Sequence, residues 1–281
     1  MQSLALPRGR ILSLEPFAVM AIINVTPDSF YAPSRRRAAL DARDAALAAF
    51  QAGAAIVDIG GESTRPGSEA VALDEELDRV VPAIEAIRKA CDSAISVDTR
   101  KAGVAKAALE AGADIVNDIS ALGDEGTAAA AAAHGASVVL MHMKGEPKTM
   151  QDAPTYEDCP REVADFLSHA ADLALAAGIR RDSILLDPGI GFGKRLEDNL
   201  ALLSRLDESA ALGYPLLVGL SRKSFVGAIT GRPPEGRLAG SLGAACAAFV
   251  RGARVFRVHD TAETVDALAV FASSLAGARR R

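Results

Sequence analysis

The sequence predicts a (β/α)8 barrel, an α/β fold in which eight parallel strands close into a ring and each is followed by a helix. Two recurring patterns indicate this fold. A glycine followed by a short run of Val, Ile and Leu recurs along the chain, as expected where a helix ends at a left-handed glycine and a buried parallel strand begins. Alanine-rich amphipathic segments lie between these runs, so helices and strands alternate to the end of the chain.

Eight strands are expected in order along the chain. Five follow a glycine, in the segments AGAAIVDIG (52–60), AGADIVNDI (111–119), HGASVVLMHM (134–143), AGIRRDSILLDPG (177–189) and RGARVFRVHD (251–260). Three more fit between them, namely VMAIIN (19–24), AISVD (94–98) and PLLVGL (215–220). The alternative is an open doubly wound sheet, which usually has a nucleotide-binding glycine turn after its first strand. The segment NVTPDSF (24–30) is not such a turn, so the barrel is favoured.

Length and composition favour one globular domain. A chain of 281 residues suits a single barrel, although two small domains are also compatible with it, and we expect one domain over residues 1–281 with a core at about 18–275. Hydrophobic residues make up 49% and charged residues 24%, which predicts a large core and argues against disorder. The net charge of −5 and the absence of tryptophan argue against a nucleic-acid partner.

The cysteines and the N-terminus bear on location. Three cysteines lie far apart without CxxC spacing, which suits a reducing compartment. The first apolar stretch is interrupted by Pro7 and Arg8, so it resembles neither a signal peptide nor a membrane span. We therefore expect a cytoplasmic protein with no membrane partner.

Polar side chains stand at the end of every expected strand. In a barrel these ends converge on one mouth, where the active sites of this fold lie. A single polar residue there can equally cap the following helix, but eight polar ends together predict a polar pocket. The residues concerned, in strand order, are Asn24; Asp58, Glu62, Thr64 and Arg65; Asp98; Asn117 and Asp118; His142; Asp187; Ser221, Arg222 and Lys223; and Arg257 and His259.

The residue types suggest what such a pocket binds. Two carboxylates and an amide suit a flat heterocycle rich in N–H donors, such as an amino-pteridine or a guanine-like ring, and these come from Asp98, Asn117 and Asp187. Alternatively, the two aspartates only pair with Lys223 or Arg257 inside the barrel. A cationic set suited to phosphate oxygens comprises Arg65, Arg257 and His259.

Three further features are candidates for binding. Ser224 opens an expected helix and suits a carboxylate or phosphate. Asn24 can offer a neutral oxygen to magnesium that is held mainly by substrate phosphates, or it can simply belong to a turn. The glycines of DPGIGFGK (187–194) lack the spacing of a phosphate-binding loop, and we expect them to form a tight turn that brings Phe192 to the pocket rim. His142 is left without a role.

Eight motifs in order resemble those of the dihydropteroate synthase family, from about Met20 to His259. The motifs are NVTPDSF (24–30), DIGGESTRPGS (58–68), SVDTRK (96–101), NDIS (117–120), LMHMKGEPKTMQ (140–151), LDPGIGFGK (186–194), GLSRKS (219–224) and RVHD (257–260). The resemblance implies a (β/α)8 barrel, usually a homodimer. It also implies a magnesium-dependent enzyme of folate biosynthesis that joins 4-aminobenzoate to 6-hydroxymethyl-dihydropterin diphosphate and releases diphosphate.

The resemblance also implies roles for particular residues. The pterin ring would be held by Asp98, Asn117, Asp187 and Lys223, with a contact from Thr64 to the pterin substrate. The diphosphate would be bound by Arg257 and His259, and the magnesium by Asn24. The 4-aminobenzoate would lie under a loop containing Thr64, Arg65 and Pro66, with its carboxylate on Ser224 and its ring near Phe192 and Phe30. The catalytic set would be Arg65, Lys223, Arg257 and His259.

The implied chemistry needs no covalent nucleophile. Breaking the C–O bond leaves positive character on the pterin methylene and negative charge on the diphosphate, which magnesium, Arg257 and His259 would stabilise. Asp98 and Asp187 would supply negative charge near the pterin. Because the aryl amine of 4-aminobenzoate is neutral near pH 7, no strong general base and no Ser-His-Asp set is expected.

One segment departs from the family pattern. After NVTPDSF the family commonly continues Ser-Asp-Gly-Gly, whereas residues 31–34 here read YAPS and three arginines follow at 35–37. The proline and the loss of both glycines predict a stiffer first loop, which bears on loop closure and on the response to sulfonamide mimics of 4-aminobenzoate.

Two alternative functions stay open. One is a methyltransferase barrel that uses methyl-tetrahydrofolate, although STRPGS and SRKS together argue against it. The other is a pterin-binding paralogue without activity.

Overall fold

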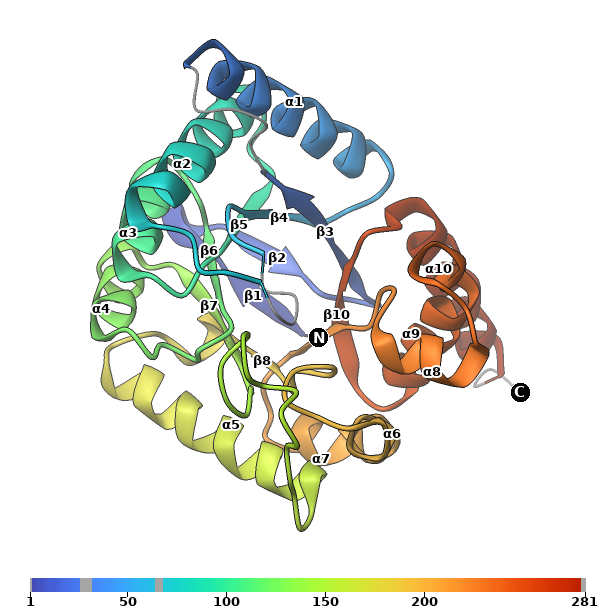
Figure 1. The fold of residues 1–281 in the computed structure, drawn as a ribbon. Coiled ribbons are helices and arrows are strands. Elements are labelled where there is room, and N and C mark those ends of the chain that lie inside the picture. The colour runs from blue at the N-terminus through green and yellow to red at the C-terminus, as the bar shows by residue number, and fades with distance from the viewer. Residues whose placement is uncertain (1, 26–31, 64–67, 279–281) are drawn as a thin grey trace.

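Eight parallel strands form a closed barrel in the computed structural model, which describes residues 2–25, 32–63 and 68–278. Around the ring the strand order is β10-β3-β4-β5-β6-β7-β8-β9, so sequential strands are neighbours and β10 closes on β3 (Figure 1). The strands are β3 (Ala18–Asn24), β4 (Ile56–Gly60), β5 (Ala94–Asp98), β6 (Ile115–Asp118), β7 (Ser137–Met141), β8 (Ile184–Asp187), β9 (Leu216–Gly219) and β10 (Ala253–Val258). The predicted fold class and all eight predicted strands are confirmed.

Helices surround the barrel (Figure 1). They are α1 (Ala32–Gln51), α2 (Leu73–Ala90), α3 (Ala102–Glu110), α4 (Glu125–His134), α5 (Cys159–Ala176), α6 (Leu196–Ser204), α7 (Leu206–Ala210), α8 (Ser224–Thr230), α9 (Leu238–Val250) and α10 (Thr261–Ala278). The glycine signal works as expected in α4, where Asp124 caps the first turn and Gly135 ends the helix at φ 59°. No helix in these described ranges is long and apolar enough to cross a membrane.

The sequence reasoning assigned no strands before residue 18, but a short antiparallel hairpin lies there, formed by β1 (Ser3–Ala5) and β2 (Ile11–Ser13). Figure 1 shows it in the middle of the ring. Its Leu4, with Leu6 and Leu14, packs against an apolar layer inside the barrel, to which every strand contributes. That layer contains Met20, Ile56, Ala94, Ile115, Val139, Leu185, Leu217 and Val255. The hairpin therefore seals the N-terminal end of the barrel.

A buried carboxylate fastens the hairpin to the barrel. Asp114 is fully buried and forms ion pairs with Arg8 at 2.7 Å, with Arg88 at 2.6 Å and with Arg10. The same side chain accepts a hydrogen bond from the backbone N–H of Ile95 at 3.0 Å. Because all of these groups lie at the closed end, the open end is left for ligands.

The barrel interior changes from apolar to polar along six of the eight strands. Side chains on alternate strand positions face the same side, so a residue two positions beyond the apolar layer also faces inward. Five polar residues stand at that distance, namely Asp58, Ser96, Asn117, Asp187 and Arg257. Two more lie four positions beyond it, Asn24 and Asp98. The polar pocket expected at the carboxyl ends of the strands therefore has a structural basis.

Candidate functional site

An ion cluster lies at the centre of the barrel mouth. Arg257 reaches from β10 to Asp58 on β4, with Nε 2.6 Å from Oδ2, and to Asp98 on β5, with Nη2 2.5 Å from Oδ2. Asn117 on β6 donates from Nδ2 to the same Asp58 oxygen at 2.9 Å. The alternative considered for Asp98, an ion pair with Arg257, is thus present. Two carboxylates share one guanidinium, so the cluster carries a net negative charge when both are ionised.

The sequence marks Asp58 only as a strand-end residue, without a role of its own. It is fully buried, and its Oδ1 atom has no hydrogen-bond partner among the described residues. Its hydrogen bond to Asn117 fixes the amide nitrogen of Asn117 toward Asp58, so the amide oxygen is left as an acceptor. An acidic residue inside the otherwise apolar run AAIVDIG was the signal that pointed to it.

The shared guanidinium affects the protonation of Asp98. Burial raises the pKa of this carboxyl to about 7; the attraction of Arg257 opposes the rise, and the neighbouring Asp58 carboxylate adds to it. A carboxyl group that titrates near neutral pH can accept or donate a hydrogen bond. Asp98 is therefore suited to a ring whose nitrogens include both donors and acceptors.

This pKa predicts how stability depends on pH. Because the folded-state pKa of Asp98 lies above the unfolded value of 3.8, its contribution is fully present below that value and is lost as pH rises through about 7. We expect the free energy of unfolding to fall between about pH 4 and pH 7, by at most about 1.4 kcal/mol per pH unit from this group. Urea denaturation of the wild type and of Asp98→Asn measures the difference.

The matched control is Asp172→Asn, on the exposed side of α5, which should keep the wild-type slope. Equal slopes for Asp98→Asn and the wild type would show that Asp98 does not titrate in this range.

A second group of site residues surrounds Lys223. Lys223 directly precedes α8, and its ammonium lies 4.0 Å from the centre of the Phe192 ring. Burial lowers the pKa of Lys223 to about 8, while the attraction of Asp187 opposes this. Asp187 accepts a hydrogen bond from the Gly189 N–H at 2.7 Å, and burial raises its pKa. The predicted turn at Gly189 does bring Phe192 to the site residues.

Three predicted residues lie on the outer part of the mouth. Asn24 ends β3 with an exposed side chain, and Ser224 is the exposed first residue of α8, directly after Lys223. His259 is exposed after β10, and its Nδ1 lies 3.1 Å from the Ser221 hydroxyl. The remaining predicted residues, Phe30, Thr64, Arg65 and Pro66, and the segment from Thr26 to Tyr31, lie outside the described residues.

The described beginning of the segment GGESTRPGS is held in place by charges. Lys101 contacts Glu62, which starts the segment's polar part, and also the buried Glu76 on α2. Arg79 donates to the carbonyl oxygen of Gly61 at 2.5 Å. The base of this loop is therefore tied to α2 and to the start of α3.

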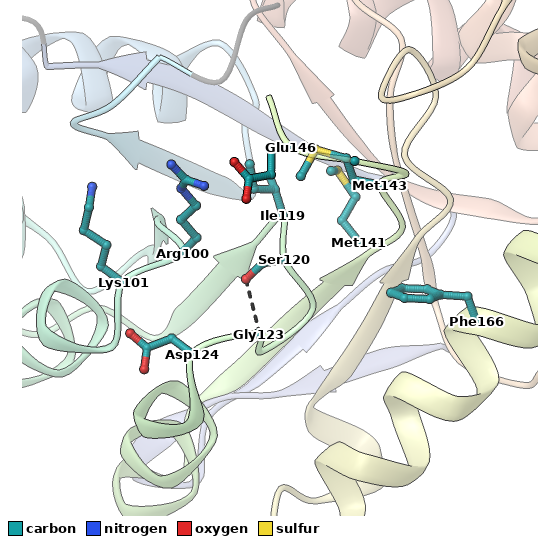
Figure 2. A pocket seen from close by; sticks show the side chains of 11 residues that line it. Arg100, Lys101, Ile119, Ser120, Gly123, Asp124, Met141, Met143, Glu146 and Phe166 are labelled. Carbon is teal, nitrogen blue, oxygen red and sulfur yellow. Dashed lines mark hydrogen bonds between the residues drawn. The ribbon is translucent and has the colours of Figure 1, made fainter. Parts of the chain in front are cut away.

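A cavity of about 520 Å³ lies beside Lys101 and the base of this loop (Figure 2). Arg100 and Lys101 lie on one side of it and the thioethers of Met141 and Met143 on the other. Met141 is the residue paired with Asp187 in the β7–β8 register, so the cavity borders the polar site. The other lining residues are Ile119, Ser120, Gly123, Asp124, Gly145, Glu146 and Phe166. A space of this size suits a small organic molecule.

Fold and site together define a barrel enzyme whose mouth is built to hold a hydrogen-bonding heterocycle. The family model described as "Pterin binding enzyme" matches residues 20–259. The dihydropteroate synthase of Escherichia coli K12 is 46% identical over 268 residues, which is 95% of both chains. The chain belongs to the family of pterin-binding enzymes and, within it, to the dihydropteroate synthases.

Solved structures of dihydropteroate synthases are similar to this chain over nearly its whole length. The dihydropteroate synthase of Xanthomonas albilineans with 4-aminobenzoic acid is 46% identical, with a TM-score of 0.88 over 97% of this chain and 98% of that one. The enzyme of Burkholderia cenocepacia in complex with 7,8-dihydropteroate is 44% identical, with a TM-score of 0.89 over 100% of this chain and 99% of that one.

Proposed function

We propose that this chain condenses 4-aminobenzoate with the dihydropterin diphosphate to give 7,8-dihydropteroate and diphosphate, as a transferase of folate biosynthesis. The observation that carries the proposal is the polar cluster of Asp98, Asn117, Asp187 and Lys223 at the mouth of a family barrel. Relatives solved with 4-aminobenzoic acid and with 7,8-dihydropteroate support the choice of substrates.

Asp98, Asn117, Asp187 and Lys223 bind the pterin ring in this proposal. The amide oxygen of Asn117 is left as an acceptor by its bond to Asp58, which suits an N–H group of the ring. The charges of Lys223 and Asp187 each shift the pKa of the other toward its charged form. The ammonium can then donate a hydrogen bond to the ring, and the carboxylate can accept one from it. Asp98 supplies negative charge near the pterin methylene, where positive character develops.

The diphosphate lies toward Arg257 and His259. Arg257 uses Nε and Nη2 for the two aspartates, and none of the described residues accepts from its Nη1, which remains for a phosphate oxygen. His259 lies exposed at the end of the same strand. Both side chains stabilise negative charge on the leaving group, so the catalysis is electrostatic rather than covalent.

Magnesium is proposed at Asn24. The exposed amide of this residue offers a neutral oxygen of the kind that magnesium prefers. The part of the chain that the structure describes contains no cluster of three His, Cys, Asp or Glu side chains placed for a metal. A magnesium ion here would be held by this one protein oxygen and the substrate phosphates, and it would neutralise charge on the diphosphate.

The 4-aminobenzoate is proposed to lie between α8 and the segment around residue 65. Ser224 binds its carboxylate at the start of α8, and the Phe192 ring packs against its aromatic ring. Thr64, Arg65 and Pro66 complete this site in the proposal. Because the aryl amine is already neutral near pH 7, holding it in line with the pterin methylene is the main task of these residues.

The direct test is diphosphate release by the purified protein with the pterin diphosphate, magnesium and 4-aminobenzoate. We expect release that requires both substrates and stops when EDTA removes the metal. Tight pterin binding without release would instead identify a silent pterin binder, and methyl transfer from methyl-tetrahydrofolate to a corrinoid would identify the other alternative. Residues 31–34 would then be exchanged for Ser-Asp-Gly-Gly to look for a gain of release.

We also propose a homodimer acting in the cytoplasm as one domain. The exposed side of α9 presents Ala239, Gly243 and Val250, whose small apolar side chains suit a helix interface. The three cysteines are unpaired, as in reducing compartments. Analytical ultracentrifugation tests the dimer, cell fractionation tests the location, and limited proteolysis tests whether the chain resists cleavage as a single unit.

A further inference from the structure

The segment 188–193 between β8 and α6 is packed against the connection that follows β7. A Cβ atom on Gly189 would lie 1.9 Å from the carbonyl oxygen of His142, and one on Gly193 would lie 2.3 Å from that of Lys144. Both glycines also have positive φ, 66° and 58°. Larger residues are excluded at these positions, so the backbone of the segment has one tightly fitted arrangement.

One buried lysine, which the sequence reasoning did not single out, holds this arrangement. The Lys194 side chain is 2% exposed, and its ammonium nitrogen lies 2.9 Å from the carbonyl oxygen of Gly189 and 3.1 Å from that of Phe192. The third partner is Nδ1 of His142, at 2.9 Å. The carbonyl oxygen of His142 lies farther away, at 3.4 Å. Burial lowers the pKa of Lys194 to about 7, and in the protonated form its three N–H donors match the three nearer partners.

His142 is the matching acceptor and joins two strands. Burial, together with the charge of Lys194, lowers its pKa to about 3, so the ring stays neutral and Nδ1 can accept at ordinary pH. The backbone N–H of His142 donates to the carbonyl oxygen of Asp187 at 3.0 Å. Through His142, Lys194 links the residues after β7 to those after β8.

Other side chains bind the same segment from its outer side. The Tyr156 hydroxyl donates to the carbonyl oxygen of Gly193 at 2.7 Å, and Gln151 donates to that of Gly191 at 3.0 Å. The N–H of Gly191 donates to Asn199 Oδ1 at 2.6 Å. Four side chains therefore bind the segment, and among them Lys194 is the one that contacts Phe192 itself.

We infer that Lys194 is a positioning residue, which holds the Phe192 ring against the Lys223 ammonium by binding the carbonyl oxygens of Phe192 and Gly189. The inference rests on the proposed function, in which Phe192 and Lys223 contact the substrates. Lys194 itself is enclosed by protein groups and acts only through the segment. Without the Lys194 side chain, the Phe192 ring and the Lys223 ammonium are no longer held in the arrangement in which they contact the two substrates.

The test is Lys194→Met, which keeps an unbranched apolar side chain one atom shorter and removes the amine donors. We expect the KM for 4-aminobenzoate and the Kd for the pterin diphosphate to rise about tenfold, because small misplacements of binding groups are costly. The effect should disappear in a Phe192→Leu background, since Lys194 acts through Phe192. Steady-state kinetics and calorimetry, below the unfolding temperature of each variant, supply these values.

The control is Lys148→Met, an exposed lysine in the same β7–α5 connection, which should leave both constants unchanged. Tyr156→Phe is a second variant, which removes one hydroxyl and should raise both constants about threefold. Unchanged constants in folded Lys194→Met, or an equal rise in the Phe192→Leu background, would overturn the inference. If Lys194→Met does not fold, Lys194→Gln, whose side-chain amide keeps two N–H donors, takes its place in the same measurements. Failure of the proposed function is distinct, because the wild type would then lack condensation, and the pterin Kd alone decides about Lys194.

Discussion

Replacing Lys223 by methionine is expected to lower kcat/KM by about 100-fold or more. The change removes one cation from the surroundings of the buried Asp187, which keeps the attractions of Lys194 and Arg257, and it takes a charged donor from the proposed pterin site. A hydrogen bond to a charged group is worth up to about 3 kcal/mol, which corresponds to a factor of about 100 in an equilibrium or rate constant. We expect most of the loss as weaker pterin binding, which calorimetry with the pterin diphosphate measures alongside diphosphate release.

Lys106→Met is the matched control, because Lys106 is exposed on α3 and lies on the outside of the barrel. It should keep wild-type affinity and turnover. If Lys223→Met also retained both, Lys223 would not belong to the pterin site, and the role proposed for Phe192 beside it would lose its support.

Replacing Arg257 by methionine is expected to remove diphosphate release and to lower the free energy of unfolding by about 3–5 kcal/mol near neutral pH. Asp58 and Asp98 then face each other without their shared cation. Removing Arg257 also removes the attraction that lowers the pKa of Asp98, so this carboxyl stays protonated to higher pH. The loss of stability should therefore be smaller at about pH 5 than at about pH 8, where ionisation costs most.

Arg254→Met supplies the comparison on the same strand. Arg254 lies three positions earlier on β10, where its guanidinium stacks on Phe249 at 5.0 Å and donates to the Phe249 carbonyl oxygen. The Arg254→Met variant should lose little free energy of unfolding, and that loss should be the same at about pH 5 and at about pH 8. Equal losses for Arg257→Met at both pH values would mean that the two aspartates are not coupled through Arg257.

The strands and helices were predictable because their signals are local. A glycine at a helix end, a continuous apolar run and an amphipathic segment each act over a few residues, and all eight barrel strands lie where those signals place them. The polar residues at strand ends were predictable as a group for the same reason, since a barrel brings all carboxyl ends to one mouth. The hairpin at residues 3–13 was missed because strands of three residues carry almost no periodicity.

What the sequence by itself determined was the (β/α)8 barrel, the end of it that carries polar groups, and the family motifs. Only the tertiary structure decided which of those groups pair. Arg257 meets Asp58 and Asp98, which are 199 and 159 positions away along the chain, and no local pattern specifies such a partner. The inward direction of Lys194 likewise depends on a turn fitted against another loop. Pairing and direction result from long-range packing, whereas helices and strands result from short-range preferences.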